Sequence, residues 1–107
     1  MATIKWNKRA RLLFVGHIDY AFHEFGATTA ARWFARKKKI EDSISKFPES
    51  FPREPLLLDR CRIYRRAALM KNFKLIYVYY PSSDTVRIVD IWDMRMNPET
   101  LKSHIKP

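Results

Sequence analysis

The chain has 107 residues, of which 47% are hydrophobic and 14% aromatic, with only two glycines. This length and composition predict one folded domain, residues 1–107, around a single core, and they exclude a disordered chain. A formal net charge of +10 predicts attraction to polyanions, so nucleic acid or an acidic protein is the expected partner.

The sequence contains no segment typical of membrane insertion or secretion. No apolar run approaches the ~20 residues that span a bilayer, so we expect a cytoplasmic protein that does not contact a membrane. Cys61 is the single cysteine, which fits a reducing compartment. The histidines, His17, His23 and His104, lack the spacing of a metal site, and we predict neither a metal nor a cofactor.

The first half of the sequence begins with a strand pattern and a helix pattern. Thr3–Trp6 is predicted as a short strand, and Asn7 is a typical N-cap for a helix over residues 8–25. Gly26 is expected to end this helix in the left-handed conformation. Apolar residues at three- and four-residue spacing predict an inward face made of Ala10, Phe14, His17, Ile18, Ala21 and Phe25.

A second helix is predicted to begin at a cap formed by Thr28 or Thr29 and to end near Lys46. Because only about two residues join the two helices, they should pack as an antiparallel hairpin. The inward face is predicted to comprise Ala30, Phe34, the stem of Lys37, Ile40 or Glu41, Ile44 and Phe47. The outward face either follows phosphates or is simply solvated, and it carries Arg32, Arg36, Lys38 and Lys39.

Prolines separate this helical half from a second half with strand character. Each proline in Phe47–Pro55 removes a backbone donor, so this segment is predicted to be a linker. Leu56–Leu58 is expected to form a short extended arm. Three strands are then predicted over residues 62–70, 73–80 and 85–93.

Tight turns should connect these strands, the first at Lys71-Asn72 and the second at residues 81–84. Asn97 is predicted to cap a last short helix that runs to about Ile105. The elements together predict an α+β fold in which a short N-terminal strand and a helix hairpin pack on one face of a three- to four-stranded, mainly antiparallel sheet. On the other face, or along its rim, the strands can bring together Arg62, Arg65 or Arg66, Lys74 and Arg95.

Several short motifs follow one another in a recognisable order. They are Asn7-x-x-Ala10, Phe25-Gly-x-Thr-Thr-Ala30, Phe47-Pro48, Glu54-Pro-Leu-Leu57, Tyr64-Arg65, Lys71-Asn-Phe-Lys-Leu-Ile-Tyr77 and Ile88-Val-Asp-Ile-Trp-Asp-Met-Arg-Met-Asn-Pro98. Over nearly its whole length the chain therefore resembles the RelE/ParE superfamily of type II toxin–antitoxin toxins. The resemblance implies a basic toxin that an acidic antitoxin holds inactive in a hetero-oligomer. It implies one of two targets, messenger RNA cleaved on the ribosome or DNA gyrase, and the fold does not decide between them.

The resemblance also implies, by position, that Arg65, Lys74 and Arg95 are the basic catalytic residues of an RNA-cleaving toxin. RNA cleavage needs a group that takes the 2′-hydroxyl proton, cations that stabilise the charged phosphate, and a donor for the leaving oxygen. Where RelE-like toxins carry a further lysine this chain has Ala67, and the ending looks more like the ParE branch. No tyrosine or histidine follows Arg95 before His104, which is the remaining candidate for the acid–base partner. The residues predicted to bind nucleic acid are Arg62, Arg66 and Lys71.

Each of these residues also has an ordinary structural interpretation. Arg65 can pair with Asp90 or Asp93, Lys74 can be an exposed strand lysine, and Arg95 can bond to Asp93. The strand aromatics are more often core than a stacking surface for bases, and they are Tyr77, Tyr79, Tyr80 and Trp92. The sequence also fits a non-catalytic basic module that binds nucleic acid or protein, or an inactive toxin homologue that retains antitoxin binding.

Overall fold

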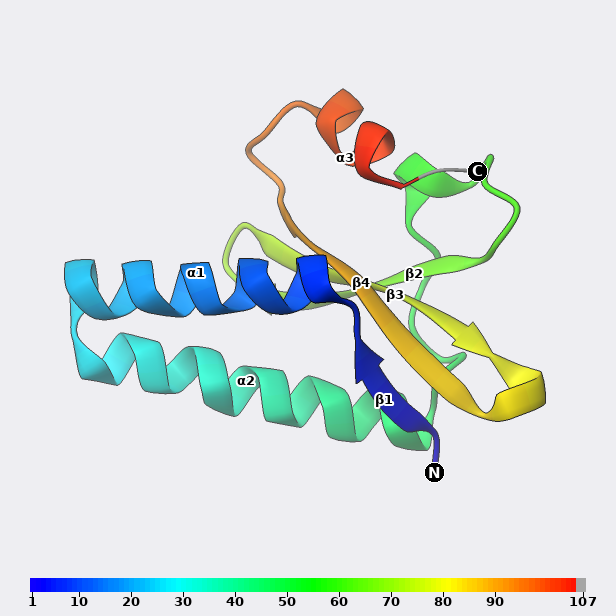
Figure 1. Cartoon of the computed structure of the whole chain (residues 1–107), viewed down its shortest axis with the longest axis horizontal. Helices are drawn as coiled ribbons and strands as arrows, with labels where there is room; N and C mark the ends of the chain where they lie inside the picture. Colours follow the sequence, from blue (N-terminus) through cyan, green and yellow to red (C-terminus); the bar gives the residue numbers. More distant parts are fainter. Residues whose placement is uncertain (106–107) are drawn as a thin grey trace.

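The computed structural model describes residues 1–105, which form a four-stranded mixed sheet with helices on both sides (Figure 1). The strands are β1 (Thr3–Trp6), β2 (Tyr64–Met70), β3 (Phe73–Tyr80) and β4 (Thr85–Asp93), and their order in the sheet is β1-β4-β3-β2. The pair β1–β4 is parallel, whereas β2–β3 and β3–β4 are antiparallel. The predicted α+β fold with a mainly antiparallel sheet is therefore confirmed.

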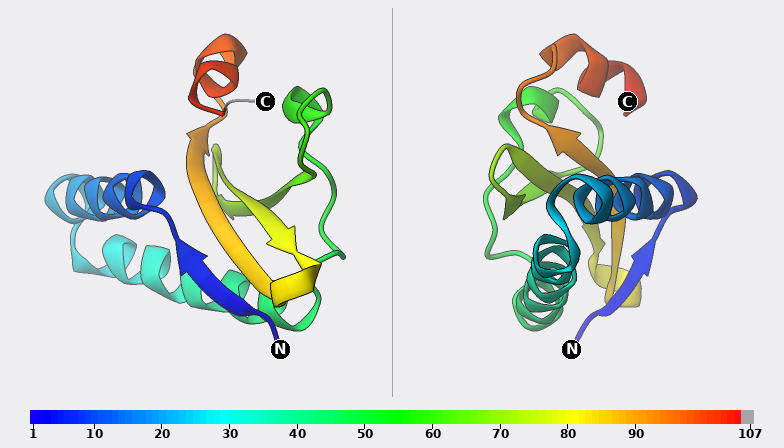
Figure 2. Two further views of the ribbon diagram at one scale, coloured as in Figure 1. Left: turned by 45° about the vertical axis from the view of Figure 1, so that its right-hand side comes forward. Right: turned by 90° about the vertical axis from the view of Figure 1, so that its left-hand side faces the viewer.

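Helices α1 (Lys8–Phe25) and α2 (Ala27–Lys46) form the predicted antiparallel hairpin and cover one face of the sheet. On the other face lie α3 (Pro98–His104) and the later part of the connection from α2 to β2, which contains the 3-10 turn η1 (Pro55–Leu57). Figure 2 shows the curved sheet between these two coverings. Among residues 1–105, none of the helices is long and apolar enough to cross a membrane.

Asn7 joins the start of α1 to the sheet. Its side-chain oxygen accepts from the backbone N–H of Ala10 at 2.8 Å, which is the predicted N-cap, and its Nδ2 donates to the carbonyl of Val89 at 3.2 Å. The same residue thus satisfies a free donor of the helix and fixes the helix end on β4.

Gly26 ends α1 and begins α2 in a single residue. Its φ of 88° and ψ of 179° lie in a region that is essentially restricted to glycine, and its N–H donates to the carbonyl of Phe22 at 2.9 Å. Helix α2 consequently starts at Ala27, so the prediction of a cap at Thr28 or Thr29 was wrong. Gly26 is therefore the single residue between α1 and α2.

The core between the hairpin and the sheet differs from the predicted inward faces at three aromatic residues. Phe25, Phe34 and Phe47 are 66%, 56% and 64% exposed. Phe25 lies at the end of the hairpin that projects beyond the sheet (Figure 1), and Trp33 takes the buried position expected for Phe34. The buried residues that the helices contribute are Ala10, Phe14, Ala21, Ala30, Trp33, Ile40 and Ile44.

A second apolar core lies on the opposite face of the sheet, under α3. It consists of Leu57, Tyr64, Ile76, Val78, Trp92, Leu101 and Ile105. Arg60 holds this layer in place, because its Nε donates to the carbonyl of Ile105 at 3.0 Å and its Nη2 to that of Lys102 at 2.9 Å. This second face of the sheet is therefore also covered, by α3 and the turn η1.

Two local predictions before β2 were wrong. Leu56–Leu58 does not form an extended arm, because Pro55 begins the 3-10 turn η1. Strand β2 starts at Tyr64 rather than Arg62, since the chain bends through residues 59–62 while Arg60 reaches α3. The predicted turns after β2 and β3 are confirmed, with Asn72 and Asp84 at φ 69° and 48°.

The two glycines offer a matched test of this fold. Gly26→Ala should lower the free energy of unfolding by about 1–3 kcal/mol, because alanine is strained at a φ of 88°. Gly16→Ala should raise it by about 0.5–1 kcal/mol, because Gly16 lies inside α1 with no atom within 4 Å of an added Cβ. Urea denaturation of both variants measures the difference. Equal effects of the two substitutions would contradict the assigned corner at Gly26.

Candidate functional site

The three predicted catalytic cations lie on different sides of the sheet. Arg65 is opposite Tyr77 in the ladder and therefore faces the helix hairpin, whereas Lys74 is opposite Trp92 and faces α3. Arg95 follows β4 and lies over the ring of Phe73 on the hairpin side, at 5.6 Å. The structure thus does not bring these side chains together.

Arg65 and Arg95 both have partners within the chain. Arg65 does not pair with Asp90 or Asp93, because its Nη1 donates to the carbonyl of Phe51 at 2.7 Å. Arg95 forms the alternative bond to Asp93, with its Nε and Nη2 each 2.9 Å from a carboxylate oxygen. This hydrogen bonding lowers the pKa of Asp93.

Lys74 is buried, so it is not an ordinary exposed strand lysine. Its residual exposure is 8%, and its Nζ donates to Oε1 of Glu54, a residue with no exposed surface. The second oxygen of Glu54 and the Nε of Arg66 are also buried, and neither has a hydrogen-bond partner among residues 1–105. A buried carboxylate therefore lies next to one cation and has one oxygen unpaired.

Asp90 and His104 form a second polar pair on the same face. The Nδ1 of His104 is 3.3 Å from Oδ2 of Asp90, and the two side chains are 25% and 1% exposed. Burial raises the pKa of Asp90, while the hydrogen bond from His104 and the charge of Arg9, 3.7 Å away, act against this rise. An ionised carboxylate can only accept, so it favours the tautomer with the proton on Nδ1 and leaves Nε2 to accept a proton.

The register of the sheet places Arg66, Lys74 and Asp90 on one face, in two neighbouring rows. Arg66, Ile76 and Asp90 are cross-strand neighbours in one row, and Ala68, Lys74 and Trp92 form the next row. The ring of His104 lies 6.5 Å from that of Trp92. We call Glu54, Arg66, Lys74, Asp90 and His104 the far-face cluster.

The sequence predicted three members of the far-face cluster and missed their acidic partners. Lys74 and Arg66 were candidates, and His104 was the remaining acid–base candidate. Glu54 appeared only inside a motif, and Asp90 only inside another motif and as a partner for Arg65. No local pattern indicates that a carboxylate from a proline-rich linker reaches the middle of a sheet.

Comparisons with known proteins identify the fold. No family model matches the chain, and no curated protein matches its sequence. A crystal structure of the isolated E. coli RelE toxin superposes with a TM-score of 0.61 and covers 98% of this chain and 100% of its own. The chain has the RelE fold. At 13% identity, this likeness shows the fold and not the residues of the site.

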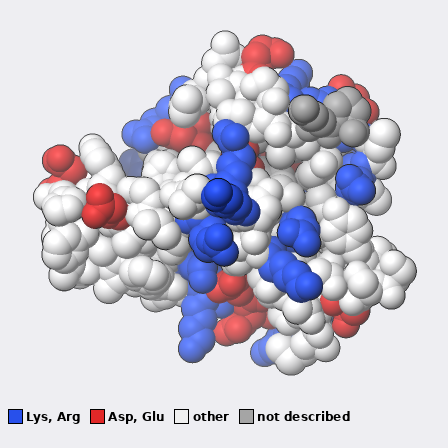
Figure 3. Space-filling view, viewed as in Figure 1, with Lys and Arg blue, Asp and Glu red and all other residues white. Residues whose placement is uncertain are grey.

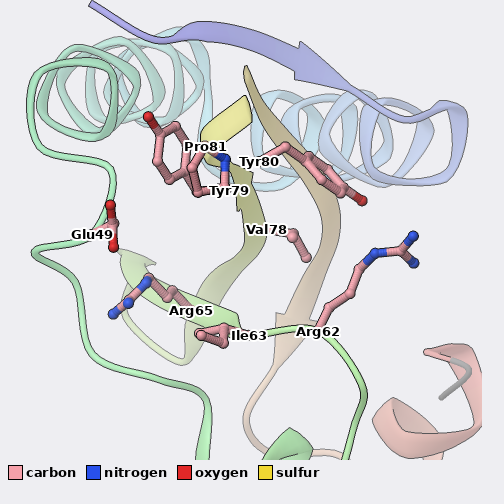
Figure 4. Close-up of a pocket in the computed structure, with 8 residues that line it drawn as sticks. All are labelled: Glu49, Arg62, Ile63, Arg65, Val78, Tyr79, Tyr80 and Pro81. Atoms are coloured by element: carbon pink, nitrogen blue, oxygen red, sulfur yellow. The ribbon is translucent and has the colours of Figure 1, made fainter. Parts of the chain in front are cut away.

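Outside the far-face cluster, this RelE fold carries the other predicted nucleic-acid-binding residues in two places. Arg62 and Arg65 line a pocket of about 240 Å³ beside the end of β3, and their side chains point to opposite sides of it (Figure 4). The guanidinium of Arg62 lies 5.5 Å from the ring centroid of Tyr80. Lys71 lies in the β2–β3 turn and, with Arg95, borders a groove of about 280 Å³ at the tip of the hairpin.

One face of the molecule carries a group of exposed basic side chains (Figure 3). Lys and Arg side chains gather in the middle of the face shown in Figure 3, over β1 and the start of α1. The exposed basic residues of these segments are Lys5, Lys8, Arg9 and Arg11. A polyanion approaching this face meets these exposed cations, with acidic side chains beside them (Figure 3).

His17 provides a pH-dependent test of the hairpin-tip groove. Its ring stacks on Trp33 at 5.5 Å and meets Phe73 edge-on at 4.6 Å. Burial lowers the pKa of His17 from 6.5, with the charge of Asp93 raising it and that of Arg95 lowering it. The folded state therefore binds this proton less readily than the unfolded state, and the free energy of unfolding should fall as pH decreases below 6.5.

The variant His17→Gln should lack this contribution and lose less stability between pH 7 and pH 5 than the wild type. Urea denaturation at several pH values measures the two slopes. His23→Gln is the control, because His23 is exposed on the same helix. Identical slopes for the wild type and His17→Gln would contradict the assigned burial of His17.

Proposed function

We propose that this protein is the toxin of a type II toxin–antitoxin pair, which inhibits bacterial growth until an acidic antitoxin neutralises it. The observation that carries the proposal is the RelE-like fold over 98% of the chain. The formal charge of +10 supports an acidic partner, because charge complementarity accelerates association and suppresses wrong partners. On this proposal the protein acts in the cytoplasm and forms a hetero-oligomer with its antitoxin.

We infer that its target is messenger RNA on the ribosome, because the far-face cluster contains the groups that RNA cleavage needs. The Nε2 of His104 takes the proton of the attacking 2′-hydroxyl, and Asp90 orients the ring and stabilises its charged form. Lys74 supplies positive charge for the phosphorane-like transition state, and Arg66 is the second cation of the cluster. The protonated His104 or a water molecule then donates to the leaving 5′-oxygen.

The other predicted cations have a different role in this proposal. Arg65 and Arg95 lie on the hairpin side of the sheet, so we propose that they bind the target outside the reacting group. Arg62 and Lys71 are exposed and can contact phosphates in the same way. Gyrase inhibition is the competing target, and it requires none of the acid–base groups of the far-face cluster.

Growth assays test the class of the protein. Inducing the chain in a bacterium should stop growth, and expressing the acidic product of an adjoining gene should restore it. Translating extracts should then show messages cleaved at fixed codon positions. Inhibited supercoiling with trapped cleaved DNA would instead indicate gyrase, and normal growth at verified expression would contradict the toxin proposal.

His104 is the sharpest test of the RNA-cleaving mechanism. The variant His104→Gln should reduce message cleavage by about 10²- to 10⁴-fold, because it removes the acid–base group. Asp90→Asn should also reduce cleavage, since the amide no longer stabilises the charged ring. His23→Gln is the matched control and should retain full activity, as its exposed side chain pairs with Asp19 on α1 and is not part of the far-face cluster. Full cleavage by a folded His104→Gln variant would exclude this mechanism.

A further inference from the structure

One carboxylate of the far-face cluster, Glu54, pairs with only one of the two cations Lys74 and Arg66. Glu54 has no exposed surface and bonds Lys74 through Oε1, while its Oε2 has no partner among residues 1–105. The buried Nε of Arg66 also lacks a partner within those residues. An acceptor and a charged donor are thus both unsatisfied in one cluster, which is costly for buried groups.

The backbone places Arg66 between the two members of the ion pair. Residues 52–54 run beside β2, because the N–H of Glu54 donates to the carbonyl of Tyr64 at 2.7 Å and the N–H of Arg66 to that of Pro52 at 3.0 Å. Glu54 is therefore level with Tyr64, whereas Lys74 is level with Ala68. Arg66 lies midway along this line, on the same face of the sheet.

The charges of these three side chains do not balance at rest. Lys74 and Arg66 contribute two positive charges and Glu54 one negative charge, so one positive charge is left over. A phosphodiester group carries one negative charge and would neutralise the group. It would also compete with Glu54 for the ammonium group of Lys74.

We propose that Glu54 is a two-position counter-ion, which holds Lys74 in the free protein and transfers to Arg66 when a phosphodiester binds Lys74. The donor geometry favours this direction of exchange. The planar guanidinium of Arg66 can bind both oxygens of a carboxylate, whereas the compact ammonium of Lys74 suits a single phosphate oxygen. After the exchange, Oε2 of Glu54 and Nε of Arg66, which both lack a partner in the free protein among residues 1–105, can bond to each other.

The phosphodiester of this inference is the RNA backbone of the proposed function, on which the inference rests. In that setting Glu54 is a positioning residue, because it acts through Lys74 and does not contact the reacting atoms. The alternative is a static structural pair in which Glu54 and Lys74 never separate. The two cases differ in whether the effect of an Arg66 substitution on binding depends on the presence of Glu54.

A double-mutant cycle on binding distinguishes them. The probe is 2′-O-methyl hexauridylate, which cannot be cleaved, and its Kd is measured by fluorescence anisotropy at one fixed ionic strength. Glu54→Gln should tighten binding about tenfold by removing the competing anion, and Glu54→Gln/Lys74→Gln should lose this gain. Arg66→Gln should weaken binding about tenfold when Glu54 is present and much less when residue 54 is glutamine.

Two controls separate the exchange from a general effect of charge. Arg62→Gln removes an exposed cation and should weaken binding by the same factor with Glu54 or with glutamine at position 54. Arg66→Lys keeps the charge but lacks the planar fork, so it should weaken binding nearly as much as Arg66→Gln. This second variant also tests the inference if Glu54→Gln fails to fold, which thermal unfolding checks.

Additive effects of Glu54→Gln and Arg66→Gln would overturn the inference, and so would wild-type affinity in Arg66→Lys. A gain in Glu54→Gln that persists without Lys74, or a probe that binds no variant, would overturn it as well. Because the readout is binding, it is independent of growth inhibition. A toxic protein with an additive cycle refutes only the exchange, whereas a coupled cycle in a harmless protein refutes only the toxin.

Discussion

Strand β3 is covered on both faces, and the alternation of its side chains decides which side of the molecule each neighbouring residue serves. Leu75 and Tyr77 pack under the helix hairpin, while Lys74 and Ile76 point to the layer that α3 covers. A residue of β2 or β4 that is paired with one of these residues has its side chain on the same face as its partner. The separation of the cations onto two faces is a direct result of this pleat.

A polar cluster inside such a doubly covered sheet is unusual for a small domain, because burying unpaired charge is unfavourable. Here Glu54 comes from the connection that leads to β2, whereas Asp90 lies on β4 beside His104 and Arg9. Glu54 balances one of the two positive charges of Lys74 and Arg66, and the remaining positive charge of these three side chains is the property that makes the cluster a candidate for anion chemistry. The RelE-like fold places the cluster but does not by itself assign its chemistry.

Much of the fold could be predicted from local signals, since Asn7, Gly26 and Asn72 act through contacts or conformations within a few residues. The cluster could not, because it depends on tertiary register. Arg87 and Asp90 share a face of the sheet only because a bulge opposite Ile76 and Tyr77 inserts an extra residue into β4. Simple alternation assigns these two residues to opposite faces. The position of Glu54 is even harder to predict, since its partner Lys74 is 20 residues away in the sequence, on strand β3, which the segment of Glu54 does not adjoin.

The anchoring of α3 by Arg60 has a consequence for how the molecule exposes its interior. Leu101 and Ile105 cover the second apolar core, and His104 on the same short helix contributes to the far-face cluster. If α3 detached from the sheet, the second apolar core would become exposed to solvent and His104 would separate from Asp90 at the same time. The geometry of the His104–Asp90 pair and resistance to local unfolding should consequently depend on the same contact, in which one arginine bonds two carbonyl oxygens.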